Sequence, residues 1–179
     1  ACMEILDHYG IDCTGKKAVV IGRSLVVGKP AAMMLLAKNA TVTVCHTRTK
    51  NMPAVCREAD IIIAAAGRAD VVGKENFSPG QTVIDVGINF TEDGRMTGDV
   101  KFDEATEIVD AVTPVPGGVG TVTTSVLIGH VVAAAEKAAQ KVGVDEFHAG
   151  LMPGDKVKHM EQLISGKDRG AVLFVGDGI

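Results

Sequence analysis

Apolar runs separated by glycine-bearing and polar turns recur along residues 1–140. Residues 17–22 form a continuous apolar, β-branched run, which is typical of a strand buried on both faces. Residues 29–39 have the length and apolar content of a helix, and Pro30 falls in its first turn. We expect further buried strands at residues 41–45, 60–65, 82–87 and 111–115, and a long apolar helix over about 122–139. The pattern predicts an α/β fold with a Rossmann-like, doubly wound and mainly parallel sheet.

The remaining segments do not follow this alternation. Residues 1–10 resemble a helix entered partway, and residues 89–99 contain the turn Glu92-Asp93-Gly94, which predicts a hairpin. After Gln140 a turn-like stretch leads to a short amphipathic helix over 156–164 and a strand over 171–175. We therefore expect a domain over 1–140 with an extra helix–strand segment over 141–179, and both ends of the chain look cut.

Composition narrows the possible compartments and partners. Apolar residues make up 46% of the chain and the net charge is only −4, so we expect an ordered globular protein with no basic field for nucleic acid or an anionic membrane. No apolar run approaches a membrane span in length, and no signal sequence is visible. The histidines lack metal-ligand spacing. The cysteines lack paired spacing, so we expect reduced thiols and a cytoplasmic protein: Cys2, Cys13, Cys45 and Cys56.

The strongest local signal is the turn from Gly22 to Gly28, between the first strand and its helix. Glycines allow a backbone to approach a pyrophosphate, and a helix N-terminus offers free N–H groups and partial positive charge. The turn also contains Arg23 and Ser24. Its spacing differs from the standard GxGxxG, so a plain connecting loop remains the alternative to a dinucleotide site.

The end of the second strand bears on the choice of dinucleotide. NAD-binding domains place an acidic residue there, whereas this chain has Cys45-His46-Thr47-Arg48-Thr49. The Thr47 hydroxyl and the guanidinium groups of Arg48 and Arg23 could bind a 2′-phosphate, which favours NADP. The alternative is that His46 and Arg48 cap a strand at a solvated edge.

A second ligand loop is expected at residues 113–120, where two prolines stiffen the chain and three glycines leave backbone groups accessible to a flat ligand. A tight strand-to-helix turn is the alternative. Asp85, at the end of the fourth strand, could contact a ligand or make a structural hydrogen bond.

Six collinear motifs give the chain a specific resemblance: VIGRSLVVGKP, ATVTVCHTRT, ADIIIAAAGR, VIDVGIN, GDV and TPVPGGVGTVTTSVL. Together they resemble the C-terminal domain of the bifunctional methylenetetrahydrofolate dehydrogenase/cyclohydrolase family, over about residues 1–140. The resemblance implies that Gly22, Arg23 and Ser24 contact NADP, with Thr47 at the 2′-phosphate and Ile88 at the nicotinamide end. It also implies a loop facing folate, made of Pro116, Gly117, Gly118, Val119 and Gly120.

The implied reaction transfers hydride from 5,10-methylenetetrahydrofolate to NADP and then hydrolyses the methenyl product, in one-carbon metabolism and purine biosynthesis. The family takes a tyrosine and a lysine for this chemistry from an N-terminal domain, and the only tyrosine here is Tyr9. We therefore expect no catalytic residue in this chain, an inactive isolated chain, and a missing N-terminal domain as partner. Thr47 stands where serine is common, and Thr121-Val122 where Pro-Met is common. The family often dimerises, so a homodimer is possible.

Residues 142–179 instead resemble part of the phosphorylation domain of P-type metal-transporting ATPases. That resemblance implies a phosphoryl contact for Lys156 and a magnesium contact for Asp177, but the phosphorylated Asp-Lys-Thr-Gly motif is absent. Three hypotheses follow: an NADP-binding half of a folate enzyme, a chimeric structural protein with residual ligand sites, and a magnesium-dependent phosphohydrolase relative. The missing nucleophile disfavours the third.

Overall fold

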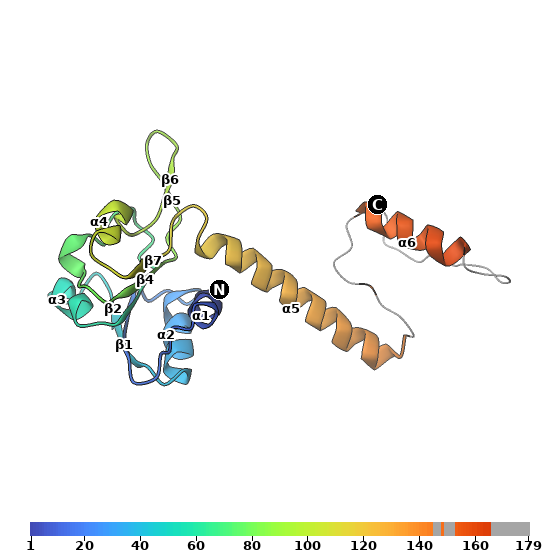
Figure 1. Cartoon of the computed structure of the whole chain (residues 1–179), viewed down its shortest axis with the longest axis horizontal. Coiled ribbons are helices and arrows are strands. Elements are labelled where there is room, and N and C mark those ends of the chain that lie inside the picture. Colours follow the sequence, from blue (N-terminus) through green and yellow to red (C-terminus); the bar gives the residue numbers. More distant parts are fainter. Residues whose placement is uncertain (145–147, 149–152, 166–179) are drawn as a thin grey trace. The chain divides into compact units, whose positions relative to one another are not determined.

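The computed structural model describes residues 1–144, 148 and 153–165 (Figure 1). The chain divides into two compact units, Ala1–Val126 and Leu127–Ile179. The first unit contains a five-stranded sheet in which all pairings are parallel, so the predicted α/β, Rossmann-like class is confirmed. The strand order is β2-β1-β3-β4-β7, with bounds Thr41–Cys45, Lys17–Ile21, Ile61–Ala64, Thr82–Asp85 and Ala111–Val112.

The strand order reverses direction at β1, since the chain moves from β1 to β2 on one side and then returns to place β3 on the other. In open parallel sheets such a reversal leaves a crevice at the carboxyl ends of the two strands, where ligands bind. The carboxyl ends of β1 and β3 are Ile21 and Ala64, which pair with each other. The topology therefore locates a candidate site before any side chain is considered.

Alternate residues of each central strand enter two separate cores, because successive side chains of a strand point to opposite faces. Ala18 and Val20 of β1 pack with residues of α1 (Cys2–His8), α2 (Gly28–Ala37) and the start of α5 (Val119–Val142). Val19 and Ile21 pack on the other face with residues of α3 (Met52–Arg57) and α4 (Phe102–Thr106). Helices thus cover both faces of the sheet (Figure 1), and its inner strands are apolar throughout.

Two expectations about the strands and helices need correction. Strand β2 was expected to be buried, but Thr41, Thr43 and Val44 are exposed because β2 is an edge strand with one neighbour. Helix α5 begins at Val119 rather than near Val122, so Val119 and Gly120 belong to its first turn. The sequence pattern also missed three short helices: α3, α4 and the 3₁₀ helix η1 (Lys74–Asn76).

The hairpin expected at 89–99 is present as antiparallel strands β5 (Asn89–Phe90) and β6 (Met96–Thr97). In the second unit, the expected amphipathic helix is α6 (Pro153–Ser165). The strand predicted at 171–175 and Asp177 lie outside the described residues.

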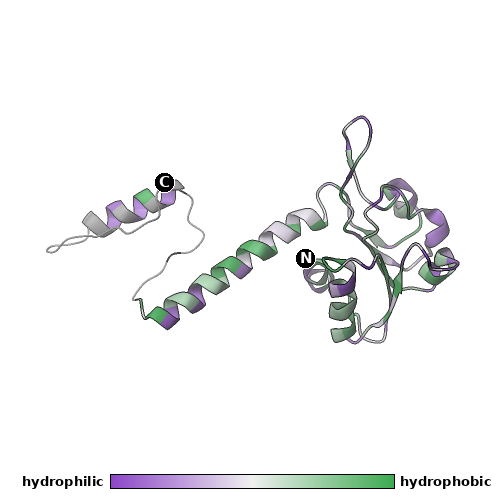
Figure 2. Cartoon of the chain, turned by 180° about the vertical axis from the view of Figure 1, so that it is seen from behind, coloured by the Kyte–Doolittle hydropathy of each residue, from purple (hydrophilic) through white to green (hydrophobic). Residues whose placement is uncertain are grey.

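Helix α5 bears on the expectation that no apolar run approaches a membrane span in length. It has 24 residues and a window of mean hydropathy 1.4, so by length and composition alone it could cross one. Only 6% of that window is buried, and Figure 2 shows apolar residues along much of the helix. The large apolar side chains exposed on this helix are Leu127, Ile128, Val131 and Val142.

Candidate functional site at the carboxyl edge of the sheet

A cavity of about 380 Å³ lies where the strand order reverses, and we call it the switch-point cavity. Its walls come from the segments that follow β1, β2 and β3, so three strand ends meet there. Its lining residues are Ile21, Gly22, Arg23, Ser24, His46, Thr47, Thr49, Met52, Ala65, Ala66, Arg68 and Val71. The structure therefore brings together the two segments that the sequence nominated for a dinucleotide, and adds a third from the end of β3.

The turn after β1 is held close to the neighbouring loop. The N–H of Gly22 donates to the Cys45 carbonyl at 2.8 Å, and its φ of +124° lies in a region that L side chains rarely adopt. A Cβ at Gly22 would overlap the Ala65 carbonyl. Ser24 Oγ accepts the N–H groups of Val27 and Gly28 at 3.1 and 3.2 Å, which fixes the entry into α2. The N-terminus of α2 is thereby presented at this edge.

Gly28 does not line the cavity. It is buried at the start of α2, where a Cβ would overlap the Gly22 carbonyl. The structure thus gives Gly28 a packing role, because close approach of strand and helix leaves no room for a side chain. Arg48 is also absent from the lining, and its N–H donates to His46 Nδ1 at 3.1 Å.

Leaving His46 aside, the formal charges among the described lining residues of the switch-point cavity are all positive. Arg23 and Arg68 both contribute to its lining, and none of its described lining residues is Asp or Glu. Arg68 was not among the residues expected at the site, although it closes the motif Ala65-Ala66-Gly67-Arg68 that follows β3. The available signal was its position after a buried parallel strand, because all such strands end at the same edge.

A second cavity, of about 240 Å³, contains the expected substrate loop, and we call it the loop cavity. Its lining combines Ile88 and Met96 with residues 114–121, so Ile88, expected at the nicotinamide end, lies beside the loop expected to face folate. The peptide bond between Val115 and Pro116 is cis. The other lining residues are Asp85, Val86 and Gly87, which continue from the end of β4.

Asp85 is the titratable group in this lining, and it is 3% exposed. Burial raises the pKa of its carboxyl group, while backbone N–H groups of Val100, Asp99 and Gly87 act in the opposite direction. These donors lie at 2.9, 3.0 and 2.8 Å from the carboxylate oxygens. The structure therefore supports a structural hydrogen-bonding role for Asp85, which was one of the two alternatives.

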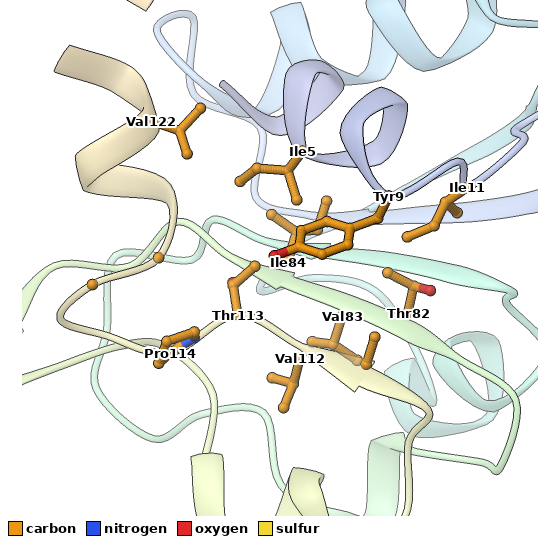
Figure 3. A pocket seen from close by; sticks show the side chains of 13 residues that line it. Ile5, Tyr9, Ile11, Thr82, Val83, Ile84, Val112, Thr113, Pro114 and Val122 are labelled. Atoms are coloured by element: carbon orange, nitrogen blue, oxygen red, sulfur yellow. The ribbon is translucent and has the colours of Figure 1, made fainter. Parts of the chain in front are cut away.

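A larger groove, of about 440 Å³, extends from the sheet to the loop after β7 and shares Pro114, Gly117 and Gly118 with the loop cavity (Figure 3). Ile5 and Tyr9 from the N-terminal segment face Ile84, Val112 and other residues of β4, β7 and the loop that follows. The groove contains no charged residue among its described lining and is mainly apolar. Tyr9, the only tyrosine of the chain, therefore belongs to this groove and not to either edge cavity.

Comparison with known proteins identifies the family. The sequence profile of the tetrahydrofolate dehydrogenase/cyclohydrolase NAD(P)-binding domain matches residues 1–139. The chain belongs to this family. The resemblance to its NAD(P)-binding domain is thus confirmed, whereas the match leaves out residues 140–179.

Individual members of the tetrahydrofolate dehydrogenase/cyclohydrolase family are similar to this chain in sequence and in fold. The bifunctional protein FolD of Carboxydothermus hydrogenoformans is 62% identical over 138 residues, which are 76% of this chain and 48% of the relative. The crystal structure of the Campylobacter jejuni bifunctional enzyme FolD has a TM-score of 0.75 at 44% identity, over 76% of this chain and 49% of that one.

A third relative is the methylenetetrahydrofolate dehydrogenase-cyclohydrolase of Trypanosoma brucei, whose crystal structure is described as a complex with NADP cofactor and inhibitor. It is 40% identical, with a TM-score of 0.65, over 69% of this chain and 44% of that one. The present chain spans about half the length of the relatives it matches.

Proposed function

We propose that the chain is the NADP-binding part of a 5,10-methylenetetrahydrofolate dehydrogenase/5,10-methenyltetrahydrofolate cyclohydrolase. The observation that carries the proposal is the charge of the switch-point cavity, which has two arginines and several hydroxyl groups but no acidic residue in its described lining. A carboxylate there would suit the ribose hydroxyls of NAD, whereas arginine and hydroxyl donors suit a 2′-phosphate. The NADP complex of the Trypanosoma brucei relative supports the same choice.

The residues present fit three parts of such a cofactor: the pyrophosphate, the 2′-phosphate and the nicotinamide. The pyrophosphate would be held by the backbone N–H groups of the turn from Gly22 to Ser24 and by the N-terminus of α2. Gly22 has no side chain, so a phosphate can approach its backbone. Thr47 and Arg23 would hold the 2′-phosphate. Arg48 could reach it only from outside the lining. Bound NADP supplies the hydride acceptor, and Ile88 would shield the nicotinamide side from water.

The loop cavity would receive the folate. Residues 116–120 present a backbone surface stiffened by proline, which suits a flat ring. No tyrosine, lysine or histidine is among its described lining residues, and the Asp85 carboxylate already accepts three backbone N–H groups. We infer that the groups for hydrolysis come from a complementary domain, so the chain alone binds cofactor without turnover.

Two apolar surfaces are consistent with a partner domain. The apolar groove of Figure 3 and, separately, the exposed apolar residues of α5 each offer a packing surface for protein. We favour packing over membrane insertion for α5, because the family match continues through residue 139. The four cysteines are free, which is consistent with a reducing cytoplasm, and the exposed edge of β2 could support a homodimer.

Residues 141–179 are proposed to be a separate appended segment, joined to the domain over 1–140 in a natural or engineered chimera. The resemblance of this segment to a P-type ATPase, including the roles suggested for Lys156 and Asp177, stays a prediction. Cofactor binding does not depend on it in this proposal, since every residue that lines the switch-point cavity precedes residue 72.

Calorimetric titration of the purified chain with NADP and NAD tests the proposal. We expect preferential binding of NADP and a raised melting temperature, because a ligand bound only by the folded state stabilises it. Arg23→Ala should weaken NADP binding about ten- to hundredfold, the range for one lost hydrogen bond to a charged group, and change NAD binding much less.

Arg95→Ala is the matched control, because this substitution removes the same charge at an exposed residue that pairs with Asp93 on the hairpin. It should bind NADP like the unmodified chain. Equal affinity for NADP and NAD would refute the assignment of the 2′-phosphate site. Binding of neither dinucleotide would favour the structural chimera instead.

A further inference from the structure

One buried carboxylate touches the walls of both edge cavities. Asp99 is 0% exposed, and its Oδ2 accepts the N–H of Gly67 at 2.8 Å. Its Oδ1 accepts the N–H of Arg68 at 3.0 Å and the side-chain N–H of Asn89 at 2.9 Å. Arg68 lines the switch-point cavity, and Asn89 follows directly on Ile88, which lines the loop cavity. Asp99 is therefore the direct hydrogen-bonded link between the two walls.

Asp99 is itself held in place by Asp85. The Asp85 carboxylate accepts the N–H of Asp99 at 3.0 Å and the N–H of Gly87 at 2.8 Å. The Asp85 N–H donates in turn to Thr113 Oγ1 at 2.8 Å, which extends the same network to the start of the substrate loop. The hydrogen bonds thus connect the ends of β3, β4 and β7, although these segments are far apart in sequence.

Two glycines allow Asp85 and Asp99 to pack closely against each other's segments. A Cβ at Gly98 would overlap the Asp85 carboxylate, and a Cβ at Gly87 would overlap the Asp99 backbone nitrogen and carboxylate. Each aspartate therefore fills the space that the glycine of the other segment leaves open. Because the two segments are packed this closely, the segment at 98–99 cannot shift without displacing the turn at 85–87.

Neither aspartate takes part in an ion pair found among the described residues. Their buried oxygens are matched instead by N–H donors whose positions depend on three separate loops. A buried carboxylate is costly to desolvate, and an apolar residue would serve packing alone at less cost. We therefore attribute the buried carboxylates to their role in fixing the positions of the loops that donate these N–H groups.

We propose that Asp99 is a positioning residue that couples the two cavities, so that occupation of the switch-point cavity orders the turn carrying Ile88. The inference rests on the proposed function, because it assumes that a dinucleotide occupies the first cavity. Asp99 touches neither ligand in this scheme. It acts through Arg68 on one side and Asn89 on the other.

The test uses the full chain and two variants. Asn89→Ala removes one donor to Asp99 at a residue that does not line the switch-point cavity, and Asp99→Asn replaces the carboxylate with an amide of the same shape. Thr91→Ala is the control, since Thr91 lies on the same hairpin and, among the described residues, its side chain hydrogen-bonds only to Asp93 and Arg95. The probe is adenosine 2′,5′-bisphosphate, which corresponds to the half of NADP that lacks nicotinamide.

Three quantities are measured: amide hydrogen exchange at Gly67 and Arg68 without ligand, the dissociation constant of the probe, and the NMR shifts of the Ile88 and Met96 methyl groups when the probe is added. In the unmodified chain the probe should shift both methyl signals, although they line the other cavity. Asn89→Ala should speed exchange at Gly67 and Arg68 about tenfold, weaken the probe about three- to tenfold and reduce the methyl shifts by at least half.

Thr91→Ala should leave all three quantities unchanged, and Asp99→Asn should exceed Asn89→Ala in each. If Asp99→Asn does not fold, Asn89→Ala still decides the matter, because it loses a single hydrogen bond. Unchanged exchange at Gly67 and Arg68 in Asn89→Ala, or probe binding without any methyl response, would overturn the coupling while leaving the proposed function intact. Failure of the unmodified chain to bind the probe or NADP would instead refute the proposed function and with it the coupling.

Discussion

The close approach of Gly22 to the Ala65 carbonyl gives a quantitative prediction for Gly22→Ala. An alanine at a φ of +124° costs about 1–3 kcal/mol in backbone strain. Its Cβ would also overlap the Ala65 carbonyl, and forced overpacking costs about 1–3 kcal/mol more. We expect a loss of about 4 kcal/mol in the free energy of unfolding, which for a domain of this size lowers the melting temperature by roughly 10–15 °C.

Gly80→Ala separates the two contributions. Gly80 also has a positive φ, +86°, but a Cβ there would have no atom within 4 Å, so strain acts without overlap. Thermal and urea unfolding followed by circular dichroism should therefore show a smaller loss for Gly80→Ala, about 1–2 kcal/mol. If the two variants unfold at the same temperature and urea concentration, the overlap at the β1 turn is not what requires glycine, and the reasoning about Gly22 fails.

Three further predictions concern buried groups. Gln81→Leu should lower the unfolding free energy by about 3 kcal/mol in urea titration, because Gln81 Nε2 donates to the Cys56 and Ala59 carbonyls and its Oε1 accepts the Ser78 N–H; a loss below about 1 kcal/mol would contradict this. Because burial raises the folded-state pKa of Asp85, its contribution to stability is present below its unfolded pKa and is lost as pH rises through the folded value. Carbon-13 NMR titration should give an Asp85 pKa above 3.8, and a value at or below 3.8 would show that the N–H donors outweigh burial. Burial raises the pKa of Cys56 to about 11, so only about a thousandth of this thiol is ionised at pH 8. A thiol reagent should therefore label Cys56 far more slowly in the folded chain than in the unfolded chain. Equal labelling rates would disprove its burial.

The extent to which the site was predictable differs between its parts. The turn with Gly22, Arg23 and Ser24, Thr47 after β2, Ile88 and the loop 116–120 were each nominated from the sequence, and each lines one of the two edge cavities. That Ile88 lies beside the loop 116–120 was not expected. The signals for the turn and for Thr47 are local, because both come shortly after a strand and parallel strands end at one edge. Ile88 was nominated by the family resemblance alone. Arg68 was missed, since the motif that contains it has no marker of its own besides that position.

The burial of β2 and the limits of the helices were less predictable for a different reason. The alternation of threonine and valine in residues 41–45 is compatible with an edge or a central strand, and only the strand order decides which. Helices α3 and α4 have 6 and 5 residues, too few for a helical period to show, and they are stabilised by packing on the sheet.

The sequence by itself determined the inner strands, the helix after the glycine turn, the hairpin and the family, because these depend on local composition, turn chemistry and collinear motifs. Only the tertiary structure decided that Asp85 and Asp99 interlock through Gly98 and Gly87, that Arg68 joins Arg23 at one cavity, and that Tyr9 lies in another. These are contacts between segments separated by ten or more residues. Their geometry follows from the order of the strands and from the requirement that buried polar groups find partners, and neither is encoded in a local pattern.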